Sequence, residues 1–127
     1  MRGWLLLAIL FTGCTKAPVA TYVDSRACAG CHADIAKTYS QTGMARAFTR
    51  AAAAVVPLGK YDHPASGRTY EISTRDGRFF QTRTSKDVPP LEREIHYVMG
   101  SGNKARSFLH RTPQGRLVEL PLGWYNE

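Results

Sequence analysis

The stretch Arg68-Thr69-Tyr70-Glu71-Ile72-Ser73-Thr74-Arg75-Asp76-Gly77-Arg78-Phe79-Phe80-Gln81-Thr82-Arg83 decides the fold expected for the second half of this chain. Apolar and polar side chains alternate over 68–75, and in part over 78–83, as in strands that bury one face. Asp76-Gly77 lies between these two runs, and this dipeptide is a strong hairpin signal. We therefore predict two antiparallel strands joined by a tight turn.

Three further strands are expected after this hairpin, over 94–99, 105–111 and 116–120. Gly100-Ser101-Gly102-Asn103 is expected to be a tight loop between strands, because it lacks the full spacing of a phosphate-binding loop. Thr112-Pro113-Gln114-Gly115 is expected to be a turn with its proline well placed. Together these elements predict an antiparallel β-meander over residues 58–127.

The segment before the hairpin has helical periodicity instead. Four residues would share one helix face at i, i+3, i+4 and i+7, namely His32, Ile35, Ala36 and Tyr39. Gly43 is expected to end or bend this helix, and Met44 to Phe48 is expected to continue as a further helical turn. Pro57 closes the segment, so residues 25–57 are predicted to be helical.

Cys28-Ala29-Gly30-Cys31-His32 is the most specific chemical signal in the sequence. Two cysteines separated by two residues and followed by histidine form the attachment signature of c-type haem. The thiols of Cys28 and Cys31 would form thioethers to the two vinyl groups of one haem c, and the imidazole of His32 would bind the iron. The expected fold class is thus α+β, with an N-terminal helical haem-attachment segment followed by an antiparallel β-meander.

Two other uses of these residues stay open. Zinc could be held by Cys28, Cys31 and His32 with one more histidine, although the adjacent Cys31 and His32 would strain such a site. A thioredoxin-like dithiol requires a βαβ context, which the pattern does not show. These weaker interpretations together leave a structural metal or dithiol domain without haem as one alternative to a cytochrome.

The second axial ligand of the iron has several candidates: Met44, His96 and His110, then His63 and Met99. Each of them, taken alone, is more often a structural residue than a ligand. A straight helix would carry Met44 about 18 Å from His32 at 1.5 Å per residue, so Met44 reaches the iron only if the chain bends at Gly43. With the sixth position open, the iron could bind a small ligand, so a haem enzyme is a second alternative to an electron carrier.

The first residues are typical of an export signal. Met1-Arg2 precedes an apolar run, Trp4 to Phe11, that is too short to span a bilayer. Phe11-Thr12-Gly13-Cys14 resembles the lipobox of bacterial lipoproteins, in which the cysteine is lipidated. We expect a lipoprotein-type signal peptide over 1–13, a lipidated Cys14, a tether over 14–24 and a cytochrome c-like domain over 25–127. The mature protein would be exported, facing the periplasm or anchored at the outer membrane.

The charge of the chain bears on its partners. The formal net charge is +7, and the isoelectric point is about 9.7. Most of the basic residues are expected to lie on a solvated surface. The positive charge also favours docking to acidic redox partner proteins or to a membrane surface. No nucleic-acid partner is expected, because an exported chain does not meet chromosomal DNA and no basic–aromatic groove pattern stands out.

Several stretches together resemble the N-terminal part of bacterial multihaem c-type cytochromes, some of which carry tetratricopeptide repeats downstream. The similar stretches are 27–35, 41–46, 66–70, 75–80, 96–103, 107–110 and 119–125. In that family, a helix after C-x-x-C-H often carries a Ser-x-His-Ala stretch whose histidine is the distal ligand. Thr42-Gly43-Met44-Ala45 occupies that place here, so the resemblance nominates Met44.

The resemblance implies a domain that binds one covalent haem and transfers single electrons to redox partner proteins. Such proteins usually continue to further C-x-x-C-H motifs, whereas this sequence stops at Glu127. The resemblance therefore implies either a shortened product or a natural one-haem relative.

Overall fold

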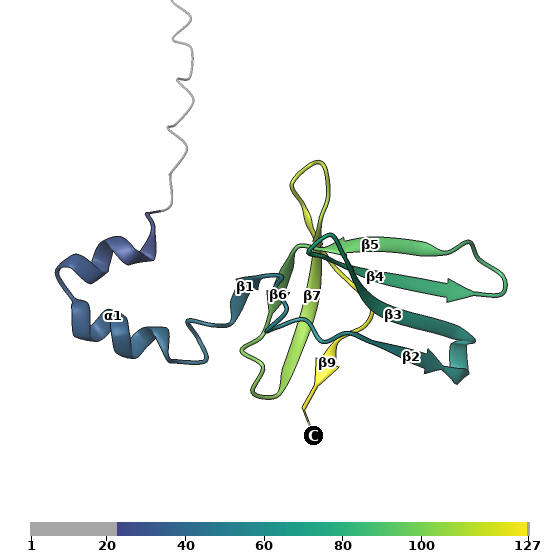
Figure 1. Cartoon of the computed structure of the whole chain (residues 1–127), viewed down its shortest axis with the longest axis horizontal. Coiled ribbons are helices and arrows are strands. Elements are labelled where there is room, and N and C mark those ends of the chain that lie inside the picture. Colours follow the sequence, from purple (N-terminus) through teal and green to yellow (C-terminus); the bar gives the residue numbers. More distant parts are fainter. Residues whose placement is uncertain (1–22, 127) are drawn as a thin grey trace, which may run out of the picture.

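The computed structural model describes residues 23–126, and Figure 1 shows how their elements are arranged. The expected signal peptide and Cys14 lie outside this range. The helical elements are η1 (Ser25–Gly30), α1 (Ala33–Ser40) and η2 (Pro64–Ser66). The strands are β1 (Phe48–Arg50), β2 (Gly59–His63), β3 (Arg68–Arg75), β4 (Arg78–Ser85), β5 (Leu91–Ile95), β6 (Tyr97–Met99), β7 (Ala105–Arg111), β8 (Leu117–Glu119) and β9 (Trp124–Tyr125). No helix within 23–126 is long and apolar enough to cross a bilayer.

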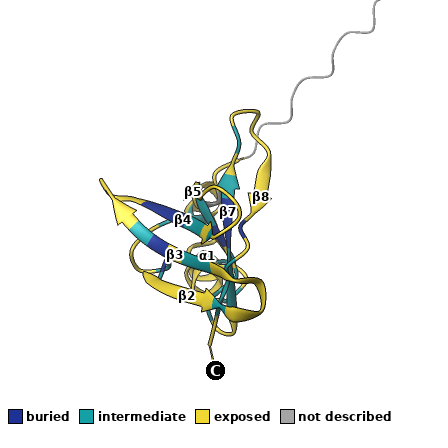
Figure 2. Cartoon of the chain, turned by 90° about the vertical axis from the view of Figure 1, so that its right-hand side faces the viewer, coloured by how far each residue is buried: buried dark blue, intermediate teal, exposed yellow. Residues whose placement is uncertain are grey.

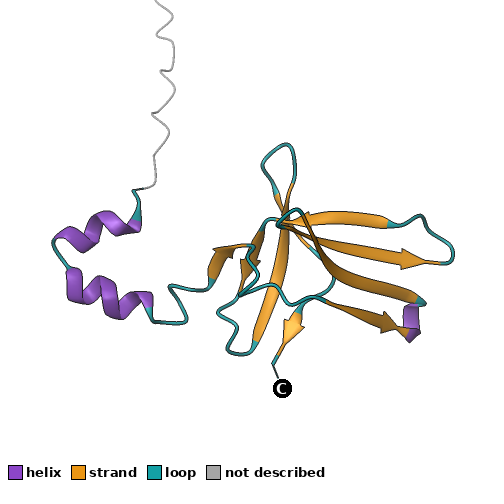
Figure 3. Ribbon diagram, in the orientation of Figure 1, coloured by secondary structure: helices purple, strands orange, loops and turns teal. Residues whose placement is uncertain are grey.

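The strands form two antiparallel sheets rather than one. The first is a four-stranded meander in the order β2-β3-β4-β5, and the second has the order β1-β6-β7-β8 with β9 added to β7. Only His96 separates β5 from β6, so the chain passes from one sheet to the other at this residue. Figure 3 shows the helical elements at the N-terminal end and at the short η2, with strands making up the rest.

The expected α+β fold, a helical haem segment followed by one meander, is wrong. The fold is mostly antiparallel β-sheet, with α1 as the single α-helix of the described residues. The expected helical segment over 25–57 contains a strand, because Phe48-Thr49-Arg50 pairs with β6 and the Ala51 amide donates to the His96 carbonyl at 3.0 Å. These hydrogen bonds between distant segments of the chain override the local helical pattern.

The hairpin predicted at Asp76-Gly77 is confirmed. Both residues have positive φ, 52° and 72°, as a two-residue type I′ hairpin turn requires. Arg75 pairs with Arg78 directly beside the turn. The strand expected over 94–99 is instead divided at His96 between the two sheets.

The hydrophobic core lies where the two sheets meet. Its buried members are Val56, Ile72, Phe79, Ile95, Val98, Phe108 and Leu120. The buried positions of β4 lie near its start, at Phe79–Gln81, and that of β5 at its end, Ile95, whereas Figure 2 shows β2 exposed along most of its length. No residue of α1 is buried, so the helical segment lies outside this core.

Candidate functional site

Asp24 begins the segment that carries the cysteines. Its carboxylate accepts a hydrogen bond from the Arg26 amide at 2.9 Å and forms a salt bridge with the Arg26 guanidinium at 2.6 Å. These interactions, the side-chain hydrogen bond first, lower the pKa of Asp24 to about 2. Asp24 therefore caps the 3-10 helix η1 in its ionised form, as acidic N-cap residues do.

The C-x-x-C-H stretch is held by its own backbone. The amides of Cys31 and His32 both donate to the Cys28 carbonyl, at 3.3 and 3.0 Å. Both thiols are free and exposed. His32 lies at the N-cap of α1 with φ −128° and ψ 50°, and its side chain makes no capping hydrogen bond. The two sulfurs and the exposed imidazole are thus presented to solvent on one short segment.

An open groove of about 640 Å³ lies along this segment. Its walls are Arg26, Cys28, Ala29, His32, Ile35, Ala36, Tyr39, Ser40 and Ala45. The helix face predicted from the spacing of His32, Ile35, Ala36 and Tyr39 is therefore the face that lines the groove. The volume is within the range of sites for small molecules and cofactors.

The apolar wall of this groove is exposed. Ile35 has 67% of its surface accessible and Tyr39 has 48%. Large apolar side chains on a helix normally pack against another element. In Figure 1, α1 lies to one side of the sheets, joined to them through the chain that leads into β1. The Ile35–Tyr39 face of α1 therefore does not pack against the sheets and is open to another binding partner.

The chain leaves the helical conformation before Gly43, the residue expected to end or bend the helix. The helix ends at Ser40, and consecutive turns follow, with the Arg46 amide donating to the Gly43 carbonyl at 3.2 Å. Ala45 thereby reaches the groove wall. Met44 is its direct neighbour and is 77% exposed, so its thioether is free of packing.

His96 and His110 are brought together by the sheets, away from the groove. Their ring centroids lie 5.1 Å apart. The Nδ1 of His110 donates to the Glu94 carbonyl at 2.9 Å, which leaves Nε2 with the lone pair in the neutral ring. The Nδ1 of His96 accepts from the Arg111 amide at 3.1 Å, and its Nε2 faces the Glu94 carboxylate at 3.9 Å. In these tautomers the lone pair of His96 accepts a hydrogen bond, whereas that of His110 accepts none from the described residues.

The remaining candidate ligands also lie outside the groove wall. The Nδ1 of His63 is hydrogen-bonded to the Ser66 hydroxyl at 2.7 Å, so this histidine stabilises the turn at η2. Met99 lies on β6 opposite Phe48 and is 44% exposed. Within residues 23–126, no three His, Cys, Asp or Glu side chains lie close enough together to share a metal ion.

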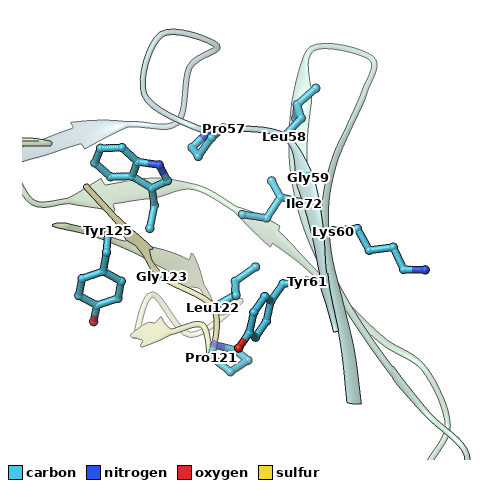
Figure 4. Close-up of a pocket in the computed structure, with 11 residues that line it drawn as sticks. Pro57, Leu58, Gly59, Lys60, Tyr61, Ile72, Pro121, Leu122, Gly123 and Tyr125 are labelled. Atoms are coloured by element: carbon cyan, nitrogen blue, oxygen red, sulfur yellow. The ribbon is translucent and has the colours of Figure 1, made fainter. Parts of the chain in front are cut away.

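A second groove, of about 540 Å³, was missed by the sequence reasoning. It lies between β2 and the C-terminal segment, with Tyr61, Pro121 and Leu122 close together (Figure 4). Pro57, Leu58, Gly59, Lys60, Ile72, Gly123, Trp124 and Tyr125 complete its walls. The signal that could have indicated it is the set of aromatic residues Tyr61, Trp124 and Tyr125, because aromatic side chains commonly line binding grooves.

The first groove combines the Cys28 thiol, the His32 imidazole and an apolar helix face, and the exposed Cys31 thiol lies on the same segment beside it. Comparisons with family models, with curated proteins and with solved structures find no match for this chain.

Proposed function

We propose that this protein is a c-type cytochrome domain that binds one haem covalently and transfers single electrons. The observation that carries the proposal is the groove in which Cys28, His32 and the exposed apolar face of α1 lie together. Haem c requires two thiols at this spacing, a histidine directly after them and an apolar surface for the macrocycle. The described residues supply all three.

The groove fits haem better than it fits a zinc ion. Zinc needs four ligands that converge on one point. In haem c the sulfurs bond to carbon at the edge of the ring, so only the imidazole of His32 has to face the metal. The Cys28 and Cys31 thiols are exposed and do not form a metal site with a third ligand from the described residues. This arrangement suits covalent haem attachment better than zinc binding.

The residues of the groove would have different roles in binding the haem. Cys28 and Cys31 hold the cofactor, and His32 supplies one axial lone pair. Ile35 and Tyr39 exclude water from one side of the ring, which favours the less charged, reduced state. The bound haem supplies the one-electron chemistry, through ferric and ferrous iron.

Met44 is the distal ligand that this proposal favours. The chain bends after α1, and Ala45, the next residue, lines the groove. The side chain of Met44 is exposed and has no competing contact to break. His96 and His110 are the alternatives, and His110 is the better of these because its Nε2 keeps a lone pair.

A second candidate function is the binding of a small ligand, such as peroxide, nitric oxide or nitrite, at an open sixth position. It is favoured by one observation: neither Met44 nor His96 nor His110 is part of the groove wall. An open iron site would give a five-coordinate spectrum and bind added ligands, whereas an electron carrier would be six-coordinate and low-spin.

We also propose that the protein is exported and lipidated at Cys14, which would confine it to a membrane surface beside its redox partners. A second acyl chain anchors a protein far better than one. Replacing Cys14 with serine would release the protein from the membrane fraction without loss of haem, since Cys14 is not part of the C-x-x-C-H stretch.

A pyridine haemochrome spectrum of protein produced with a cytochrome c maturation system tests the haem proposal. We expect one haem per chain that stays with the protein in acidified acetone. The Cys28→Ala/Cys31→Ala variant is expected to be colourless, and Cys14→Ser is the matched control that keeps its haem. A colourless wild-type protein with both thiols open to alkylation would refute the proposal.

A further inference from the structure

The two faces of the four-stranded sheet differ in charge. One face packs on the core through Ile72, Phe79 and Ile95, and we call it the inner face. The register places the following residues on the inner face further along the sheet: Tyr61, His63, Arg68, Tyr70, Arg83, Ser85, Leu91 and Arg93. None of these residues is acidic. The acidic residues of the strands lie on the opposite, outer face: Asp62, Glu71, Glu92 and Glu94.

The arginines of the two faces are used differently. On the outer face, Arg75 pairs with Glu92 at 2.9 Å and Arg78 with Glu94 at 3.5 Å. The three arginines of the inner face, Arg68, Arg83 and Arg93, form no ion pair within residues 23–126. The inner face therefore carries uncompensated positive charge beside half-buried tyrosine and leucine.

The C-terminal segment covers only part of the inner face. The side-chain amide of Gln81 donates to the Leu122 carbonyl and its oxygen accepts from the Leu122 amide, both at 3.1 Å. These two bonds fix the segment over the middle of the sheet. Beyond Gln81, no element of residues 23–126 forms a second layer over the rows Tyr70–Arg83–Leu91 and Arg68–Ser85. Figure 1 shows this end of the sheet extending away from the other strands.

The uncovered area is continuous with the second groove. Tyr61 belongs to both, and in Figure 4 its ring lies beside Pro121 and Leu122 while the Lys60 ammonium extends away from the groove. Tyr61 is 51% exposed and Tyr125 is 76% exposed. Tyrosine, tryptophan and arginine are the residues that contribute most to protein interfaces. An apolar centre with a polar rim is the usual composition of a docking site, and arginine is enriched in such sites.

The edge of the sheet is open at the same place. β2 is the last strand in the order β2-β3-β4-β5, and nearly all of its residues are exposed. An edge strand offers main-chain donors and acceptors to an added peptide. This feature favours a polypeptide over a nucleic acid, which has no backbone that can extend a sheet.

We propose that the inner face, from Arg68 and Arg83 to the groove beside β2, binds an extended acidic segment of a partner protein. Carboxylates on one side of that segment would pair with the three arginines, and its apolar side chains would enter the groove. Binding at this face does not require the haem.

The test is fluorescence anisotropy of the full chain with a labelled peptide of alternating glutamate and threonine, repeated with lysine in place of glutamate. We expect the acidic peptide alone to bind, and more weakly as salt is raised. The Arg68→Gln/Arg83→Gln/Arg93→Gln variant should lose affinity by about tenfold or more, which corresponds to roughly 1.4 kcal/mol. The matched control, Lys37→Gln/Arg111→Gln/Arg116→Gln, removes the same charge from exposed side chains elsewhere and should bind like the wild type.

Three outcomes would overturn the proposal. In the first, the control variant loses as much affinity as the inner-face variant, so that net charge alone explains binding. In the second, the inner-face variant keeps its thermal midpoint and its affinity. In the third, a labelled thymidine oligonucleotide binds more tightly than the peptide and depends on the same arginines. The colourless Cys28→Ala/Cys31→Ala variant should bind the peptide normally, which separates this proposal from the haem proposal.

Discussion

Gln81 is the buried polar residue on which the relation between the four-stranded sheet and the C-terminal segment depends. Its side chain is 3% exposed and makes both of its hydrogen bonds to the backbone of Leu122. Gln81→Met keeps the length and volume of the side chain and removes both bonds. The substitution therefore isolates the hydrogen bonds from any cavity.

The expected cost follows from what is left unpaired. A buried donor or acceptor without a partner costs about 1–3 kcal/mol. Leu122 is half-buried, so water can reach part of its backbone and reduce that penalty. We expect Gln81→Met to lower the free energy of unfolding by about 2 kcal/mol, and the thermal midpoint by about 8 °C or more.

Urea unfolding followed by circular dichroism measures this loss. Gln114→Met is the matched control, because Gln114 is exposed in the turn before β8 and should change stability by less than about 0.5 kcal/mol. The acidic-peptide assay adds a second readout, since a released C-terminal segment would also disrupt the groove. A Gln81→Met protein as stable as the wild type would show that the segment is held by packing alone.

Three further predictions follow from single residues. Met44→Ala should convert a low-spin, six-coordinate iron spectrum to a high-spin one that binds added ligands, whereas Met99→Ala should not; equal spectra for both variants would remove Met44 as the ligand. Gly100→Ala should destabilise the protein by at least about 2 kcal/mol in urea unfolding, because φ is +110° and the new Cβ would overlap the carbonyl of Ala105; near-native stability would refute this account. Because the pKa of Asp24 is lowered to about 2 in the folded state, its carboxylate stabilises the protein above the usual value of 3.8 and loses this effect as pH falls toward 2. Asp24→Asn should therefore flatten the acid limb of the urea midpoint over that range, and an unchanged limb would count against the salt bridge.

Local signals could be predicted from the sequence, and non-local ones could not. The Asp76-Gly77 turn and the strand over 105–111 depend on neighbouring residues, and both are present. β1 is three residues long, and its pairing with β6 joins distant parts of the chain. Nothing within Phe48-Thr49-Arg50 indicates that partner, so the helical pattern around it misled the prediction.

The division into two sheets depends on one residue. The stretch over 94–99 contains no glycine or proline that would interrupt a single strand. In the structure, the His96 amide donates to the Leu109 carbonyl and the His96 carbonyl accepts from Ala51, which turns the chain from one sheet to the other. Those partners come from β7 and from the segment after β1, and the sequence of the strand itself does not contain them.

In the candidate site, too, local features could be predicted from the sequence and features that join distant segments could not. The shared face of His32, Ile35 and Tyr39 could be predicted, because helical spacing alone places them together. That Ala45 closes the groove could not, since it depends on the turns that follow Ser40. The choice of distal ligand depends on distances between segments, which spacing does not fix.

The helical segment is the part of the chain that is hardest to explain without a cofactor. An isolated helix as short as α1 is marginal in water, and no residue of α1 is buried. Its own hydrogen bonds, including those of Thr38 and Ser40 to the preceding carbonyls, cannot replace a packed face. A group that bonds to Cys28 and Cys31 would tie η1 to the groove and cover Ile35 and Tyr39 at once. The same group would stabilise the helix and give it its chemistry. This argument supports the proposed haem site over one at the His96–His110 pair, where the sheets already supply the packing.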